Sequence, residues 1–172
     1  MEITQLPLGL SLIKSKFHQD ERGQVAEIWR QTTLPNIKFV QENISISHYR
    51  VLRGIHFQRK YPQGKLISVL SGVICDVAVD IRDKSPTFGS YHKEILDSNN
   101  ANMLWIPAGF AHGFSVLSET AVVLYRLTDY YHPDDQGSLK WNDPDLNIDW
   151  GIQNPILSEQ DKNGIYLRDY QA

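Results

Sequence analysis

The sequence predicts an all-β fold, a sandwich or barrel with few short helices. Short runs rich in β-branched and aromatic residues recur along the chain and are separated by glycine, proline or polar turns. Helical periodicity is nearly absent, and closely spaced strands with such turns favour a sandwich or barrel. No internal repeat, low-complexity tract or linker divides the 172 residues. Residues 1–172 are therefore expected to form one domain.

Strand patterns occur in six segments, which are residues 24–29, 41–49, 66–70, 73–81, 113–117 and 121–128. In the second of these the alternation is carried by Ile44, Ile46 and His48. The Ser71-Gly72 dipeptide predicts a tight turn that joins two of the strands as a hairpin, with residues 73, 77, 79 and 81 on one face. The polar break at residues 118–120 predicts a second pair.

The C-terminal part of the sequence has a different character. One short helix is expected near Ser158 to Asp161, where a serine precedes acidic residues. From Tyr130 onward, prolines alternate with Asn and Asp, but aromatic residues such as Trp141 and Trp150 still require burial. We expect this segment to wrap over the barrel.

Composition restricts the possible partners and the compartment. The net charge of −3 and the absence of a basic block argue against nucleic acid, whereas small anionic ligands are compatible with the scattered arginines. A single cysteine, Cys75, lies in an apolar run and is expected to be a buried, inert thiol. The first residues lack a basic start and a long apolar stretch, so neither a signal peptide nor a membrane span is indicated. We expect a soluble, cytoplasmic protein.

Two histidines and a lysine are the candidates for chemistry. His56 follows Arg53-Gly54, Lys65 follows a glycine, and His112 ends a Pro-x-Gly-x-x-His run that resembles the second motif of the cupin superfamily. A histidine in such a position can be a base or a metal ligand. Gln58 stands where cupin metal sites carry the second histidine of a His-x-His pair, so a metal would lose a ligand. No bound metal is therefore predicted.

A series of ordered motifs spans nearly the whole chain. The motifs are residues 20–23 (DERG), 39–43 (FVQEN), 51–58 (VLRGIHFQ), 63–65 (QGK), 76–82 (DVAVDIR), 85–89 (SPTFG), 106–114 (IPAGFAHGF), 125–131 (YRLTDYY), 141–144 (WNDP) and 157–161 (LSEQD). Together they resemble the dTDP-4-dehydrorhamnose 3,5-epimerases. The resemblance implies a cupin-type jelly roll, no cofactor, and a homodimer with strands exchanged between barrels. It implies an isomerase acting on carbons 3 and 5 of a dTDP-linked 4-keto-6-deoxy sugar.

The resemblance also implies catalytic roles. His56 would be the base, and Asp161 would orient its ring and stabilise the imidazolium. Lys65 would stabilise charge on the oxygen of carbon 4. Tyr125 would return a proton from the opposite face of the sugar, as inversion requires.

Substrate-binding roles are implied for a further set of residues. Arginines suit bidentate anion contacts, so Arg22 and Arg53 would meet the diphosphate or the sugar oxygens. Tyr131 would stack on thymine, and in a regular strand it would share a face with Tyr125. The remaining implied contacts are Glu27, Gln41, Asn43, His112 and Gln136. Gln136, Gln160 and Glu42 depart from the residues that are usual in the family.

Three other functions fit parts of the pattern. A single-carbon epimerase or ketoisomerase of the same fold would differ in which carbon exchanges its hydrogen. A non-catalytic nucleotide-sugar binding module would bind without exchange. A metal-dependent cupin oxygenase would hold a metal at His56 and His112.

Overall fold

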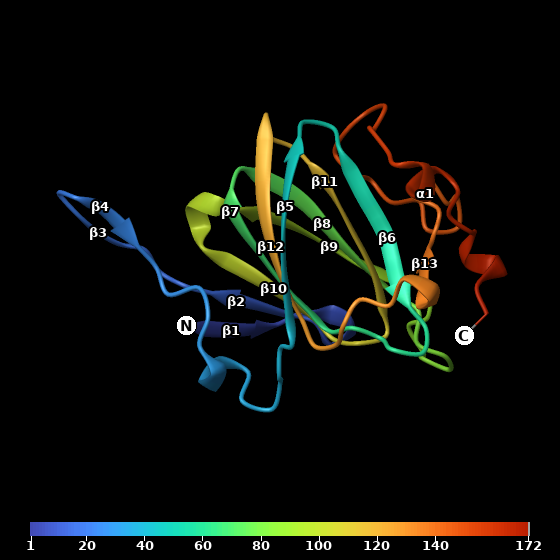
Figure 1. The fold of residues 1–172 in the computed structure, drawn as a ribbon, viewed down its shortest axis with the longest axis horizontal. Helices are drawn as coiled ribbons and strands as arrows, with labels where there is room; N and C mark the ends of the chain where they lie inside the picture. The colour runs from blue at the N-terminus through green and yellow to red at the C-terminus, as the bar shows by residue number, and fades with distance from the viewer. Residues whose placement is uncertain (172) are drawn as a thin grey trace.

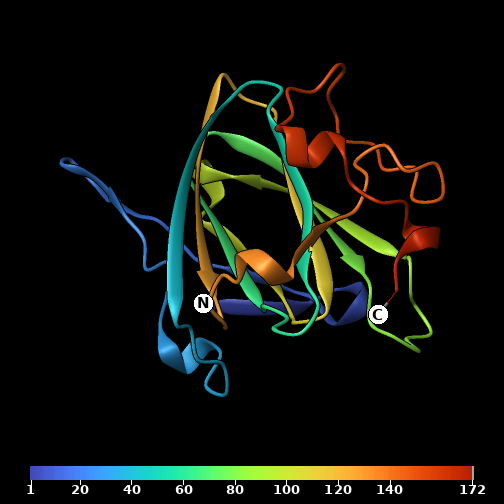
Figure 2. The same ribbon diagram turned by 45° about the vertical axis from the view of Figure 1, so that its right-hand side comes forward.

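Two antiparallel sheets face each other and form a barrel in the computed structural model, which describes residues 1–171 (Figures 1 and 2). The six-stranded sheet has the order β1 (Glu2–Gln5), β2 (Ser11–Lys14), β10 (Asn102–Ile106), β7 (Lys65–Ser71), β12 (Thr120–Leu127) and β5 (Gln41–His48). The five-stranded sheet has the order β13 (Gln136–Ser138), β6 (Leu52–Gln58), β11 (Phe110–Val116), β8 (Val73–Asp80) and β9 (Tyr91–Asp97). The predicted all-β, cupin-type jelly-roll class is confirmed.

Helical structure is limited to short turns, as predicted. One α-helix, α1 (Glu159–Lys162), has Ser158 as its N-cap. The 3₁₀ turns are Pro7–Gly9, Gln31–Thr33, Ser98–Asn100, Pro133–Asp135 and Leu167–Asp169. Within residues 1–171, no helix combines the length and apolar composition that crossing a membrane requires.

Strand β8 is buried on both faces and shows how the layers are built. Its even positions include Ile74 and Ala78, which join the cluster between the two sheets. Its odd positions include Val77 and Val79, which face outward into a second cluster. Because successive side chains in a strand point to opposite faces, one apolar run supplies both layers. Cys75 lies in the outer layer, where burial raises the pKa of its thiol to about 11.

The C-terminal segment supplies the other side of that outer layer. Leu139, Leu146 and Trp150 are buried against the outward face of the five-stranded sheet. The indole Nε1 of Trp150 donates to the Trp141 carbonyl at 2.8 Å. This hydrogen bond joins two parts of the C-terminal segment. Figure 1 shows this red and orange segment lying beside β6. The predicted wrap is confirmed.

The outer face of the six-stranded sheet is covered in part by residues 28–39. Trp29 packs edge-on against Phe39 with ring centroids 4.8 Å apart, and Phe39 packs against Trp105 on β10 at 5.8 Å. The covered cluster also contains Ile13 and Leu66. Burying these aromatic rings stabilises the loop against the sheet.

Both predicted hairpins are wrong in their pairing. β7 and β8 lie in opposite sheets, and so do β11 and β12. The short links at Gly72 and at residues 117–119 carry the chain from one sheet to the other. Alternation and turn residues are the same for a hairpin and for a link between facing sheets, so the sequence pattern does not separate them.

The predicted strand at 24–29 is also largely wrong. Strand β4 covers only Gly23–Val25 and pairs with β3 (His18–Asp20) in a two-stranded arm that projects from the barrel (Figure 1). The predicted strand at 41–49 is confirmed, but its alternating Ile44 and Ile46 point outward and are 60% and 65% exposed. Strands β1, β2, β3, β6, β9, β10 and β13 were not predicted, and β6 carries His56.

We predict that Gly72→Ala is much more destabilising than Gly9→Ala. Both glycines have positive φ, +83° and +89°, so an alanine at either costs about 1–2 kcal/mol in backbone strain. A Cβ at Gly72 would lie 2.2 Å from the Thr120 carbonyl oxygen, whereas a Cβ at Gly9 meets nothing within 4 Å. Urea unfolding should show an additional loss of at least about 2 kcal/mol for Gly72→Ala. Equal losses of stability for the two variants would contradict the close packing around Gly72 at the link between the sheets.

Candidate active site

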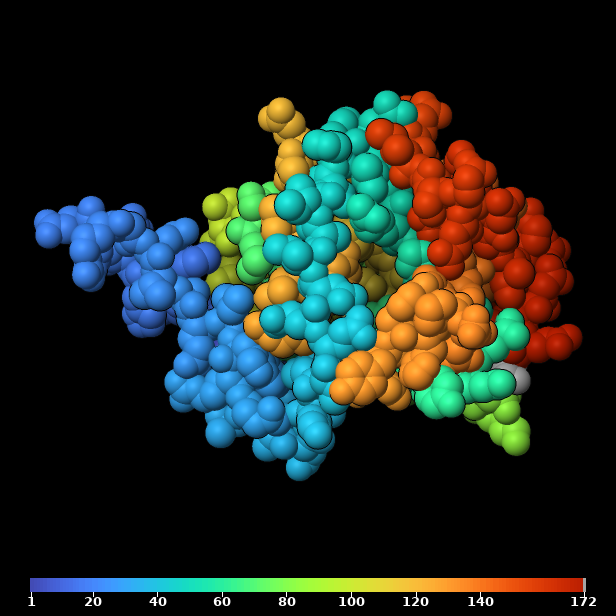
Figure 3. Space-filling model, viewed as in Figure 1, coloured from blue at the N-terminus to red at the C-terminus, as the bar shows by residue number. Residues whose placement is uncertain are grey.

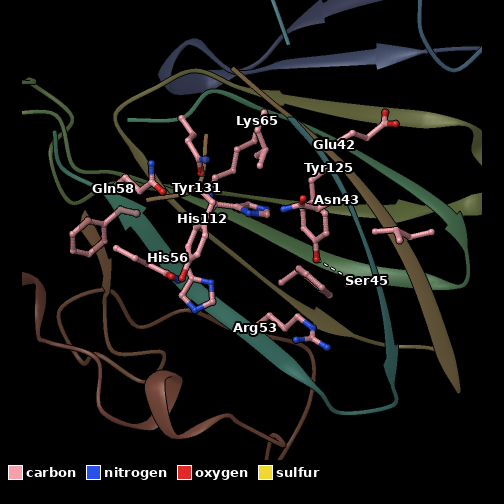
Figure 4. Close-up of a pocket in the computed structure, with 16 residues that line it drawn as sticks. Glu42, Asn43, Ser45, Arg53, His56, Gln58, Lys65, His112, Tyr125 and Tyr131 are labelled. Carbon is pink, nitrogen blue, oxygen red and sulfur yellow. Dashed lines mark hydrogen bonds between the residues drawn. The ribbon is translucent and has the colours of Figure 1, made fainter. Parts of the chain in front are cut away.

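One cavity of about 590 Å³ opens between the two sheets. This volume lies in the range of small-molecule sites. Figure 3 shows the hollowed face between β5 and β6, and Figure 4 shows His56, Lys65, His112 and Tyr125 directed into the same space. The lining residues are Glu42, Asn43, Ile44, Ser45, Arg53, His56, Phe57, Gln58, Gln63, Lys65, His112, Phe114, Tyr125, Leu127, Tyr131 and Gln136.

His56 and Asp161 form a close pair at one wall of the cavity. The imidazole Nε2 lies 2.6 Å from the Asp161 Oδ1, with 29% of the His56 side chain and 4% of the Asp161 side chain exposed. Asp161 therefore engages one ring nitrogen from the protein side, and Nδ1 is left for a substrate proton. A carboxylate in this position orients the ring and stabilises its protonated form.

Asp161 is itself held by three further hydrogen bonds. The Ser158 hydroxyl donates to Oδ2 at 2.7 Å, the Gly54 amide donates to Oδ1 at 3.3 Å, and the Asp161 amide donates to the Ser158 hydroxyl at 3.2 Å. Burial acts to raise the pKa of Asp161, but the bonds from His56 and Ser158 outweigh it and hold the pKa below its usual value. The carboxylate is thus ionised at neutral pH.

An irregularity in β6 brings Arg53 to the same cavity as His56. Residues three apart in a regular strand point to opposite faces. Gly54 has φ of +123°, and the β6–β11 register shifts between His112 and Phe114. A Cβ on Gly54 would lie 2.5 Å from the Gly113 Cα, so glycine at this position permits the close strand approach. Both side chains consequently line the cavity.

Three buried ionisable side chains, those of Lys65, Asp76 and His112, lie together at the cavity floor. Asp76 is fully buried on β8 and lies 2.9 Å from the His112 Nε2. Burial lowers the pKa of His112 and outweighs the opposing effect of Asp76. The ring is therefore neutral at pH 7. Burial likewise lowers the pKa of Lys65 to about 8, again opposed by Asp76. No ion pair within residues 1–171 involves Lys65.

Tyr125 lies on the opposite sheet from His56. Its hydroxyl is 2.7 Å from the Ser45 Oγ on the neighbouring strand β5, and its ring packs against Phe114 with centroids 6.2 Å apart. Burial raises the pKa of Tyr125 to about 12, so the phenol carries its proton at neutral pH. The site therefore places a base and a potential proton donor on facing walls.

Polar residues on and near β5 form the rim. Arg53 Nε donates to the Ser47 hydroxyl at 2.9 Å. The Tyr131 amide donates to the Gln41 Oε1 at 2.9 Å, and the Gln41 amide group donates to Asn43 at 3.1 Å. These bonds hold an arginine and a half-exposed tyrosine beside the opening.

This arrangement is suited to removing a proton next to a carbonyl. His56 can accept a proton, Lys65 can stabilise the resulting oxyanion, and Tyr125 can deliver a proton from the facing wall. Within residues 1–171, no group of three or more His, Cys, Asp or Glu side chains is placed so that it could hold a metal ion.

Comparison with known proteins identifies the family. The sequence matches the model of the family described as dTDP-4-dehydrorhamnose 3,5-epimerase over residues 4–169. The chain belongs to this epimerase family. An epimerase of that name from Pseudomonas aeruginosa is 44% identical over 176 residues, covering 98% of this chain and 97% of that protein.

Solved structures of epimerases share the fold. The structure of dTDP-6-deoxy-D-glucose-3,5-epimerase from Legionella pneumophila, in complex with dTDP-4-keto-L-rhamnose, has a TM-score of 0.93 and 42% identity, covering 99% of each chain. A more distant 3'-monoepimerase from Streptomyces bikiniensis, in complex with dTDP-quinovose, has a TM-score of 0.88 and 30% identity. It covers 93% of this chain and 84% of that one. Epimerases acting on different numbers of carbons thus share this fold.

Most of the predicted site residues come together in this epimerase-family cavity. Eight of them line it, namely His56, Tyr125, Lys65, Asn43, Arg53, His112, Tyr131 and Gln136. Asp161 and Gln41 lie behind the lining, bonded to His56 and to the Tyr131 amide. Tyr125 and Tyr131 do not share a strand, because β12 ends at Leu127, so the argument that a regular strand would put them on one face does not apply.

Arg22 and Glu27 do not reach the cavity of their own chain. Arg22 lies at the tip of the β3–β4 arm, where its guanidinium pairs with Asp20 at 2.5 Å and its side chain is 84% exposed. Glu27 follows the arm and pairs with Arg30. Neither residue lines the cavity.

Four polar residues in or beside the site were not predicted as site residues. Asp76 is a buried acid in the middle of the apolar strand β8, and an acid within such a run is the signal that could have found it. Ser45 and Ser47 alternate with the outward isoleucines of β5, so the polar half of the same alternation indicated an inward face. Gln58, at the broken metal motif, bonds the Tyr61 carbonyl and the His132 amide.

We predict that Lys65→Met stabilises the protein at pH 7. The folded-state pKa of about 8 lies below the ordinary value of 10.5, so the folded state disfavours the ammonium that the unfolded state carries. This difference corresponds to about 3 kcal/mol at pH 7 and is lost as the pH rises from 8 to 10.5. Urea unfolding should show a gain of about 1–3 kcal/mol at pH 7 that diminishes over that interval.

Lys93→Met is the matched control for this measurement. Lys93 pairs with Asp149 at 3.0 Å on the surface, and that hydrogen bond raises its pKa. Its replacement should give no gain at pH 7. A loss of stability for Lys65→Met at pH 7 would contradict the inference that the buried Lys65 ammonium destabilises the folded state.

Proposed function

We propose that the protein inverts carbons 3 and 5 of a dTDP-linked 4-keto-6-deoxyhexose and forms dTDP-4-dehydro-L-rhamnose. The observation that carries this proposal is the His56–Asp161 pair on one sheet, facing Tyr125 on the other across a cavity that also contains Lys65. Membership of the epimerase family and the sugar nucleotide bound by the Legionella relative support the substrate class. The enzyme is an isomerase that acts without a cofactor in this proposal.

The 4-keto group makes the hydrogens on carbons 3 and 5 acidic. His56 removes one of them, the C–H electron pair forms the enolate, and Asp161 stabilises the imidazolium. Lys65 stabilises the negative charge on the oxygen of carbon 4, which an ammonium in a mostly buried site does effectively. His112, held neutral by burial, hydrogen-bonds the sugar in the same region.

Tyr125 completes each inversion. It gives its hydroxyl proton to the enolate carbon from the wall facing His56, so the new C–H bond forms on the opposite face of the sugar. Solvent then returns a proton to Tyr125 and takes one from His56. The second carbon follows by the same steps after the sugar shifts in the cavity.

The rim of the cavity binds the nucleotide diphosphate. Arg53, fixed by Ser47, meets the diphosphate, because its guanidinium suits paired contacts with phosphate oxygens. Tyr131 is 50% exposed at the opening and stacks on thymine. Asn43, Gln41 and Gln136 orient the sugar and nucleotide.

The proposal includes a homodimer. Ile44 and Ile46 form an exposed apolar pair on β5, which is an edge strand of its sheet. The projecting arm carries Arg22, and Glu27 follows it, yet neither contacts the cavity of the same chain. In the dimer, the arm of one chain reaches the partner's cavity and brings these residues to the substrate.

Residues 1–172 act as one cupin-like domain in the cytoplasm in this proposal. The family match over residues 4–169 supports one functional unit. The single thiol, Cys75, is buried, which suits a reducing compartment.

Proton NMR of dTDP-4-keto-6-deoxyglucose in deuterated water tests the reaction. Loss of the signals of carbons 3 and 5 with an L-configured product supports the double epimerase. Exchange at one carbon alone would replace it with a single-carbon epimerase, and binding without exchange would replace it with a nucleotide-sugar binding module.

We predict that His56→Ala lowers the rate of exchange by about 10²- to 10⁴-fold, the usual contribution of a general base. His92→Ala is the matched control, because His92 also lies on a strand of the five-stranded sheet and pairs with a carboxylate, Glu94, at 3.1 Å, but is outside the cavity. Exchange is measured by the same NMR experiment, with dTDP affinity measured by calorimetry. Equal rates for the two variants would reject His56 as the base.

We predict that Ile46→Lys dissociates the dimer. A charge on the exposed face of β5 would be buried without a partner in the proposed interface, which is strongly unfavourable. Ile95→Lys is the control, since Ile95 is 49% exposed on β9, the edge strand of the other sheet. Sedimentation velocity should give a monomer for Ile46→Lys and a dimer for Ile95→Lys. A parent protein that sediments as a monomer would refute the interface.

A further inference from the structure

We propose that Ser45 is a positioning residue for proton delivery, which directs the Tyr125 hydroxyl hydrogen toward the substrate and hydrogen-bonds the phenolate oxygen once the proton has left. This inference rests on the proposed function, because it takes Tyr125 as the proton donor. Ser45 itself does not exchange a proton with the sugar.

The register of β5 and β12 places the two side chains in contact. Ser45 pairs with Val123 and Tyr125 pairs with Asn43, so Ser45 and Tyr125 are diagonal neighbours on the inward face. Diagonal positions in antiparallel strands are within reach of an aromatic side chain. The Ser45 Oγ lies 2.7 Å from the Tyr125 hydroxyl, and Figure 4 marks this hydrogen bond.

Two contacts from different sheets thus fix the phenol. Phe114 on β11 packs against the ring at 6.2 Å between centroids, with 48° between the planes. Ser45 on β5 holds the hydroxyl. The ring contact limits movement of the aromatic plane, and the hydroxyl contact sets the direction in which the O–H bond points.

That direction decides whether Tyr125 can act as an acid. If the phenol donated to Ser45, its hydrogen would point at the strand and away from the cavity. When Ser45 donates instead, the phenol oxygen accepts this bond and its own hydrogen is available to the substrate. Both Ser45 and Tyr125 line the cavity, so a bound sugar can select the second arrangement.

The same bond stabilises the product of the transfer. When the new C–H bond forms, the phenol O–H bond breaks and a negative charge is left on the buried oxygen. Burial opposes this charge and raises the pKa of Tyr125, while Ser45 and the Arg53 guanidinium act in the opposite direction. Asp76, on the opposite sheet, disfavours the charge. Ser45 is the neutral donor in direct contact with the oxygen.

Ser47 provides a matched control on the same face of the same strand. Its hydroxyl accepts from Arg53 Nε at 2.9 Å, so it holds a substrate-binding residue and not the phenol. Ser47→Ala should therefore weaken substrate binding while leaving the stereochemical outcome of each exchange as in the parent.

The first readout compares inversion with exchange in deuterated water. In Ser45→Ala, His56 still exchanges the hydrogen, but delivery from Tyr125 slows, so the ratio of inverted product to deuterated, uninverted sugar should fall about 10- to 100-fold. Ser45→Thr keeps the hydroxyl and should restore the ratio. An unchanged ratio in Ser45→Ala would overturn the proposal.

The second readout does not depend on turnover. The protein is labelled with 3-fluorotyrosine, whose phenol is more acidic, and titrated by fluorine NMR, with Tyr125→Phe identifying the resonance. Ser45→Ala should move the Tyr125 midpoint to higher pH and by more than Ser47→Ala, which acts on the phenol only through Arg53, and Ser45→Thr should stay close to the parent. An unchanged midpoint would overturn the Ser45 contact, even if the parent showed no exchange and the proposed function had itself failed.

Discussion

The carboxylate of Asp161 is the point on which the site depends. It joins α1 to β6 across 105 positions of sequence through the hydrogen bond to His56. The Gly54 amide and the Ser158 hydroxyl bind the same carboxylate, so the cap of the helix and the strand irregularity converge on it. The barrel forms the cavity walls, but the orientation of His56, the proposed base, is set by the C-terminal segment packed outside the barrel. Packing of the outer layer and chemistry in the cavity are therefore coupled.

Strand β5 serves the cavity and the surface at once. Its inward positions, Asn43, Ser45 and Ser47, are polar, and two of them hold Tyr125 and Arg53. Its outward positions present two exposed isoleucines at the edge of the sheet. Because strand side chains alternate, a partner that covers the outward face also restrains the strand that positions the phenol. In the proposed dimer, β5 would therefore link assembly to the positioning of Tyr125.

The sequence predicted the local elements better than their connections. Alternation located β5, β7, β8, β11 and β12, and the Ser158 pattern located α1, since these signals depend on near neighbours. The pairing at Gly72 was wrong because the facing sheet is chosen by tertiary packing. Most of the site residues that were named from the ordered sequence motifs line one cavity. Arg22 was not brought there, because the position of an arm depends on contacts beyond its own chain in the proposed dimer.

Within residues 1–171, the buried charges of the cavity leave the Lys65 ammonium without an ion-pair partner. Asp76 lies against His112 at 2.9 Å, and its attraction raises the pKa of Lys65 only in part against burial. An ammonium in this state lowers the stability of the free protein. An enolate oxygen beside Lys65 would supply the missing negative charge, and it would do so most fully in the transition state. In the proposed mechanism, the stability given up at Lys65 in the free enzyme would be converted into selective binding of the reacting species.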